Sequence, residues 1–333
     1  MAVIVIHAGM PKAGSSSIQQ WLEKSWRTLR ERDLTLIVAP PSESGDIAFV
    51  PYEEGAADSG WMFEGAGKEP RAVPQKTADA LIEGLAGSAE RFGDVVVSSE
   101  HFAIPFWGLH GPTLAGFQRL SCSHELKVAY YARPQDSALE AAWRQAGYRT
   151  GVPPSAYIAE NAVRMDYAAT RQGVWEVAPG MKFEPKPFRT DLLERDEVVC
   201  DFARHFLGMD LREQPEWVNR GLPLEVVNVL HAAPPVMFWD ESYGNLRIAR
   251  IKALVDGEHF PEDDRVALSR QVLRKYAYEK FAKGNAELGW DDFVLPPDDP
   301  QRIPGIEALD RLWTPSASPA ELSLLFRALR AAI

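Results

Sequence analysis

Two patterns of apolar and polar positions follow each other at the start of the chain. Residues 2–6 (AVIVI) form an unbroken, mostly β-branched apolar run, which is typical of a central strand in a parallel sheet. From Ser15 onward, the apolar residues Ile18, Trp21 and Leu22 recur at the three- and four-residue spacing of a helix. A short segment from Gly9 to Gly14 separates the two patterns. The start of the chain is therefore predicted to be a strand, a glycine loop and a helix.

The same alternation continues along the rest of the chain. Further strands are predicted at 34–38, 95–97 and 126–132, with a short one at 181–183. Further helices are predicted at about 76–92, 137–148, 197–207, 263–290 and 318–329. Strands that each lead through a loop into a helix indicate an α/β fold, a central parallel sheet flanked by helices. Ligands of such sheets bind at the carboxyl ends of the strands.

Composition narrows the class of protein. Apolar residues make up 46% of the chain and charged residues 25%, the mix of an ordinary globular protein. The chain has a formal net charge of −11, so it lacks the excess of basic residues that is typical of a nucleic-acid-binding protein. A local site can still hold an anion. The two cysteines, Cys122 and Cys200, form no CxxC motif, and the histidines show no ligand spacing. We expect no metal site and no nucleic-acid partner.

The hydropathy of the chain also bears on its location. No stretch approaches the ~20 apolar residues of a membrane span. The N-terminal apolar run is too short for a signal peptide and follows no charged segment. We therefore expect a cytoplasmic protein with no membrane span.

The glycine loop is the first candidate binding site. Small residues let backbone N–H groups approach phosphate oxygens, and the following helix N-terminus favours an anion. A nucleotide-binding P-loop reads G-x-x-x-x-G-K-[ST]. Here Gly9 and Gly14 match, but Ser15 occupies the lysine position and the lysine sits earlier, at Lys12.

The order Pro-Lys-x-Gly-Ser-Ser in this loop resembles the 5'-phosphosulfate loop of the sulfotransferases that use 3'-phosphoadenosine 5'-phosphosulfate, bacterial members in particular. The resemblance implies a P-loop-like three-layer fold, and a reaction that needs no metal. It also implies that Lys12 contacts the bridge between phosphate and sulfate. The donor-binding loop would then comprise Lys12, Ala13, Gly14, Ser15, Ser16 and Ser17.

A second phosphate element follows from the same resemblance. The family binds the 3'-phosphate with an arginine at a strand end and a serine eight residues later. The strand 126–132 runs into Arg133, whose guanidinium can form two parallel hydrogen bonds to a phosphate. Eight residues on stands Ala141 instead of serine, and Ser137 lies one turn earlier as a substitute.

Sulfuryl transfer also needs a base that takes the proton of the acceptor. The family places a His or Glu at a strand end between the two phosphate elements. The strand at 95–97 leads into Ser98, Ser99, Glu100 and His101. Glu100 falls at the base position, with His101 beside it as the alternative. The predicted catalytic residues are therefore Lys12, Glu100 and His101.

We expect residues 1–333 to form a single sulfotransferase domain. Segments 41–75, 150–178 and 232–262 match no part of the family pattern, and we expect them to be lid or acceptor-binding insertions. The acceptor classes are a carbohydrate, a lipid head group or a small metabolite. Two other functions stay open: a P-loop nucleotide-dependent kinase, and a non-catalytic binding protein on a sulfotransferase-like fold.

Overall fold

The structure is a computed structural model that describes residues 1–9, 13–39, 47–53, 75–107, 109, 111–211, 222, 224–231, 250–251, 264–313 and 323. The chain divides into two compact units. The first unit contains residues 1–133 and 166–219, and the second contains residues 134–165 and 220–333.

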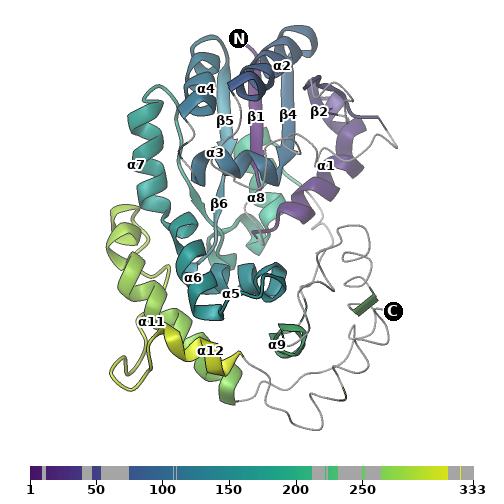
Figure 1. The fold of residues 1–333 in the computed structure, drawn as a ribbon. Coiled ribbons are helices and arrows are strands. Elements are labelled where there is room, and N and C mark those ends of the chain that lie inside the picture. Colours follow the sequence, from purple (N-terminus) through teal and green to yellow (C-terminus); the bar gives the residue numbers. More distant parts are fainter. Residues whose placement is uncertain are drawn as a thin grey trace. The chain divides into compact units, whose positions relative to one another are not determined.

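A five-stranded sheet forms the centre of the first unit (Figure 1). Its order is β3-β2-β4-β1-β5, and every neighbouring pair is parallel except β2 and β3. The strands are β1 (Val3–Ala8), β2 (Leu34–Val38), β3 (Val50–Pro51), β4 (Asp94–Ser99) and β5 (Glu125–Ala129). This mostly parallel sheet confirms the predicted α/β class.

The central strands are apolar throughout because helices cover both faces of the sheet. Ile4 and Ile6 of β1 and Val95 and Val97 of β4 are fully buried. In register, Ile4 pairs with Val95 and Ile6 with Val97, so the two strands end together at Ala8 and Ser99. The carboxyl ends of β1 and β4 therefore meet at one edge of the sheet.

The direction of each crossover decides which face a helix covers. The chain passes from β1 through α1 (Ser15–Arg30) to β2, and then turns back through α2 (Gln75–Phe92) to β4, between β2 and β1. Since crossovers of this kind are right-handed, α1 and α2 lie on opposite faces. The next crossover, from β4 through α4 (Gly111–Ser123) to β5, runs in the same direction as the crossover through α2. Helix α4 therefore lies on the same face of the sheet as α2.

Packing agrees with these two layers. Helix α4 packs against α2, whereas α1 packs against α8 (Val198–Leu207) (Figure 1). The helix predicted from Ser15 onward begins at that residue, and those predicted at 76–92 and 197–207 are confirmed to within about one residue at each end. Helix α8 ends at Gly208, which adopts the left-handed conformation typical of a helix C-terminus.

The strand predicted at 126–132 is interrupted at Tyr130 and forms β5 and the short β6 (Tyr131–Ala132). The prediction of a strand at 181–183 is wrong. The strand is β7 (Lys186–Pro187), which pairs in parallel with β6. The apolar side chains of Met181 and Phe183 pack in the core without a strand partner, whereas the N–H groups of residues 186 and 188 donate to the carbonyls of residues 130 and 132.

The regular elements described in the second unit are helices, and residues 288–305 form turns and irregular structure. Its longer helices are α5 (Gln135–Gln145), α6 (Pro154–Ala162), α9 (Leu224–His231) and α11 (Asp264–Glu287). The short α12 (Leu309–Leu312) leads to Trp313, whose ring stacks on that of Trp143 at 5.2 Å between centroids. The predicted helix at 318–329 lies outside the described residues, apart from residue 323.

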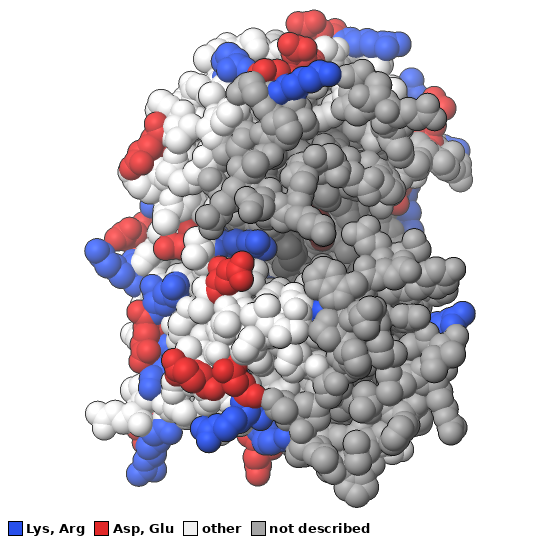
Figure 2. Space-filling model, viewed as in Figure 1, with Lys and Arg blue, Asp and Glu red and all other residues white. Residues whose placement is uncertain are grey.

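The three expected insertions differ in what is described. Segment 150–178 forms α6 and α7 (Tyr167–Val177), so it is helical. Segment 41–75 is described only at 47–53, which includes β3, and at residue 75, and segment 232–262 only at 250–251. On the surface seen in Figure 2, Lys and Arg side chains are interspersed with Asp and Glu over the described part.

Candidate functional site

The crevice between the ends of β1 and β4 is the candidate site. After β1 the chain leads into α1 on one face of the sheet, and after β4 it leads through η2 (Glu100–Ala103) and α3 (Ile104–Trp107) to α4 on the other. Neighbouring parallel strands whose connections leave to opposite faces create a crevice at their carboxyl ends, where ligands of open α/β sheets bind. The glycine loop and Glu100 both lie at this point.

Two glycines shape the described ends of the loop. The N–H of Gly9 donates to the carbonyl of Ser99 at 3.2 Å, and a Cβ at Gly9 would lie 2.8 Å from the Cβ of Ser15. Gly14 caps α1 in the left-handed conformation, with φ of +77°. A Cβ there would lie 2.6 Å from Cγ1 of Val198, closer than side chains pack. Both positions therefore require glycine.

Ser15 and Glu100 are brought together across the crevice. The Ser15 hydroxyl donates to Oε1 of Glu100 at 2.8 Å, with Ser15 buried and Glu100 half-buried. Because this hydroxyl is bound to a carboxylate, an anion at the loop would meet the backbone N–H groups at the start of α1 and the half-buried Ser16. Ala13 and Ser17 are buried. The described end of the loop therefore offers an anion mainly the backbone N–H groups at the start of α1.

Two predicted catalytic groups have no described side chain. Lys12 lies outside the described residues, which resume at residue 13. His101 belongs to η2, but the position of its side chain also lies outside the described part. The structure therefore places Glu100 against the loop and leaves the roles of Lys12 and His101 as predictions.

Arg133 lies directly after β6, which pairs with β7 in a separate two-stranded sheet that follows the interruption at Tyr130. Its carbonyl accepts a hydrogen bond of 2.8 Å from the hydroxyl of Tyr167, the first residue of α7. Burial raises the pKa of Tyr167, so this phenol stays a neutral donor. Ser137 lies in the first turn of α5, in the second unit, where its hydroxyl donates to the carbonyl of Pro134 at 3.0 Å.

A buried polar pair lies behind the crevice. Nδ1 of His7 in β1 is 2.7 Å from the hydroxyl of Ser98 in β4, and the His7 ring packs on Phe202 of α8 at 5.5 Å. Burial lowers the pKa of His7 from 6.5 to about 3. His7 is therefore a neutral core histidine that connects the two strands bordering the crevice.

We predict that His7→Gln reduces the sensitivity of the fold to acid. The unfolded chain binds a proton at His7 below pH 6.5, whereas the folded protein resists it down to about pH 3. Stability is therefore lost as pH falls through this window, by up to about 1.4 kcal/mol per pH unit. Urea unfolding at pH 7 and pH 4 should show a smaller loss in the variant, which cannot gain this charge. Equal losses in both proteins would contradict a buried neutral His7.

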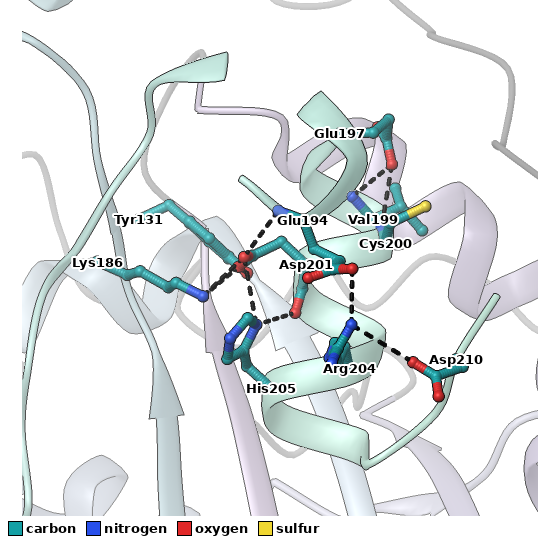
Figure 3. Close-up of polar contacts among 10 residues, drawn as sticks. All are labelled: Tyr131, Lys186, Glu194, Glu197, Val199, Cys200, Asp201, Arg204, His205 and Asp210. Carbon is teal, nitrogen blue, oxygen red and sulfur yellow. Dashed lines mark hydrogen bonds and ion pairs between the residues drawn. The ribbon is translucent and has the colours of Figure 1, made fainter. Parts of the chain in front are cut away.

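Sequence reasoning missed one polar group in this unit, the buried carboxylate of Asp201. Asp201 is fully buried on α8 and bonds to Tyr131 of β6 and Lys186 of β7 (Figure 3). The available signal was an acidic residue within the otherwise apolar run of 198–203 (VVCDFA). Its partners lie far away in the sequence and could not be read from it.

Comparison with known proteins adds nothing to this geometry: no protein-family model, curated protein or solved structure matches the chain. Within the described part, no three His, Cys, Asp or Glu residues gather into a group that could hold a metal ion. None of the described helices combines the length and apolar character needed to cross a membrane. The structure defines the class as an α/β protein with a mostly parallel central sheet flanked by helices.

Proposed function

We propose that this protein is a sulfotransferase that moves a sulfuryl group from 3'-phosphoadenosine 5'-phosphosulfate to a hydroxyl or amine of a carbohydrate, lipid head group or small metabolite. The observation that carries the proposal is the crevice between β1 and β4, which combines a helix-opening glycine loop with the facing carboxylate of Glu100. The loop sequence resembles that of the sulfotransferase family, and for this reason we assign this donor to the crevice.

Each group of the chain has a distinct role in the proposed reaction. Backbone N–H groups at the start of α1 bind the 5'-phosphate, and the guanidinium of Arg133 binds the 3'-phosphate. The donor supplies an activated sulfuryl group. As the acceptor oxygen or nitrogen bonds to sulfur, Glu100 takes its proton. The bond from sulfur to the bridging phosphate oxygen breaks, and Lys12 stabilises the charge on the departing adenosine 3',5'-bisphosphate.

The order of the parallel strands supports a P-loop-like arrangement. In Rossmann and flavodoxin-like sheets the first strand lies beside the second. Here β4 lies between β1 and β2, so the strand that carries the glycine loop borders β4 and β5 instead. The loop also lacks the G-x-G-x-x-G spacing of dinucleotide-binding folds.

The bond between Ser15 and Glu100 favours a second candidate, a Mg²⁺-dependent nucleotide kinase. P-loop enzymes hold Mg²⁺ between a loop hydroxyl and a carboxylate at a strand end. Ser15 at the P-loop lysine position argues against this function, because no cation follows Gly14 to reach the terminal phosphates.

Titration calorimetry of the full chain separates these functions. We expect adenosine 3',5'-bisphosphate to bind more tightly than adenosine 5'-phosphate, and Arg133→Ala to remove that difference because the 3'-phosphate loses its bidentate partner. ATP with Mg²⁺ should bind weakly. Binding of ATP only with Mg²⁺, and no binding of the bisphosphate, would establish the kinase instead. If none of the three binds, the chain is not a sulfotransferase.

A further inference from the structure

Asp201 is a buried carboxylate on which several segments of the first unit converge. Its oxygens accept 2.7 Å bonds from the hydroxyl of Tyr131 and from Nζ of Lys186, and a 3.2 Å bond from the N–H of Glu194 (Figure 3). Nδ1 of His205, one turn along α8, lies 3.2 Å from Oδ1. A buried charge is tolerated only when it is paired and hydrogen-bonded in this way, so the donors must hold defined positions.

The partners of Asp201 lead to both phosphate elements of the crevice. Tyr131 stands two residues before Arg133. Lys186 stands two residues before Phe188, and Asp201 itself three residues after Val198. Phe188 and Val198 are the side chains that close on Gly14, since a Cβ at Gly14 would lie 3.2 Å from Phe188 and 2.6 Å from Val198.

Backbone bonds reinforce the same connection. The N–H of Lys186 donates to the carbonyl of Tyr130 at 2.8 Å, and the N–H of Phe188 to that of Ala132 at 2.6 Å. The β6–β7 pair therefore holds the residue before Arg133 against the segment that packs on Gly14. Asp201 joins this pair to α8 through hydrogen bonds, and the ring of Phe206 on α8 also contacts Tyr131 at 6.2 Å between centroids. Burial, and then the charge of Asp201, raise the pKa of Tyr131 well above its usual value, so Tyr131 stays a neutral donor.

We propose that Asp201 is a positioning residue that fixes the end of the glycine loop at Gly14 and the strand end at Arg133 relative to each other. As the site is proposed, one ligand must meet both elements at once, and a shift of either would leave one phosphate without its partners. This inference rests on the proposed function for its ligand, but the positioning itself is a property of the chain.

Asp201→Asn tests the inference. A carboxamide is neutral and has one acceptor oxygen. With its NH₂ group toward Tyr131 it can donate to the hydroxyl oxygen, but the hydroxyl proton loses its acceptor and the Lys186 ammonium loses its counter-charge; in the other orientation the NH₂ group faces the Glu194 N–H and Lys186. If the fraction of molecules in which the glycine loop and Arg133 are both correctly placed falls to about a tenth, the Kd for adenosine 3',5'-bisphosphate rises about 10-fold. Hydrogen exchange should also become faster in peptides covering 13–18 and 130–134, with or without ligand. Exchange in β1 and β4 should stay as in the wild type.

Arg204→Met is the matched control. Arg204 lies on the same helix and pairs with Glu194 at 2.7 Å, but its side chain is half exposed and does not reach Asp201 (Figure 3). We expect the wild-type Kd and exchange pattern in this variant. Tyr131→Phe, which removes a single donor and keeps the ring, should give a smaller effect than Asp201→Asn in the same two peptides.

The exchange measurement decides the inference independently of the ligand. Faster exchange throughout the sheet in Asp201→Asn would show a general structural role and overturn the positioning role, as would unchanged exchange at 13–18 and 130–134. If the wild-type protein fails to bind the bisphosphate, the proposed function fails, and local exchange still tests Asp201. If binding is retained at full strength in Asp201→Asn and exchange at 13–18 and 130–134 is unchanged, the inference is wrong and the proposed function stands.

Discussion

Replacement of Glu100 by Gln is expected to lower the rate of sulfuryl transfer by about 10²-fold or more, because the variant loses its proton acceptor. Gln keeps a carbonyl oxygen that can accept the 2.8 Å hydrogen bond from the Ser15 hydroxyl, so the loop should keep its position. We therefore expect kcat to fall while the Kd for adenosine 3',5'-bisphosphate stays within about twofold of the wild type. The rate is measured with labelled 3'-phosphoadenosine 5'-phosphosulfate and an acceptor found by screening.

Two further variants test whether the loss of rate comes from the missing proton acceptor. Ser15→Ala removes the bond to Glu100 but keeps the carboxylate, so its loss of kcat should be clearly smaller than that of Glu100→Gln. His101→Ala tests the alternative base. A nearly normal rate in Glu100→Gln together with an inactive His101→Ala would transfer the role to His101. Loss of Mg²⁺-dependent ATP binding in Glu100→Gln would instead identify Glu100 as a metal ligand of a kinase.

Substitution of Gly14 by Ala is expected to destabilise the protein by about 2–5 kcal/mol. The left-handed conformation costs an L-residue about 1–2 kcal/mol, and forcing a methyl group into a packed core costs about 1–3 kcal/mol more. The new Cβ would lie 2.6 Å from Val198 and 3.2 Å from Phe188, and neither is the end of a long flexible chain. Chemical denaturation of the variant and the wild type gives the difference in free energy of unfolding.

Gly208→Ala separates the two contributions. Gly208 also has positive φ, at +66°, but a Cβ there meets no atom within 4 Å. Its substitution should therefore cost only the conformational part, about 1–2 kcal/mol. If Gly14→Ala costs no more than Gly208→Ala, the close approach of α8 to the glycine loop is not part of the folded structure. A larger cost at Gly14 supports that packing.

Much of the sheet could be predicted from local sequence. The run at 34–38 is a strand with those bounds, and the helix that begins at Ser15 does begin there. These elements are determined by side chains that are close in sequence, through the spacing of apolar residues and the conformational freedom of Gly14. The prediction at 181–183 was wrong because the side chains of Met181 and Phe183 are buried equally well with or without a strand partner.

The sequence by itself determined the α/β class, the position of the glycine loop after the first strand, and Glu100 and Arg133 as residues that follow strands. Only the tertiary structure decided that Ser15 donates to Glu100, 85 residues away, and that Tyr131 and Lys186 meet at Asp201. Local patterns depend on neighbours along one helix or strand, whereas these contacts depend on strand order and on how α8 packs beside the sheet. The apolar pattern of α8 shows that Asp201 is buried, but its partners are chosen by the path of the chain.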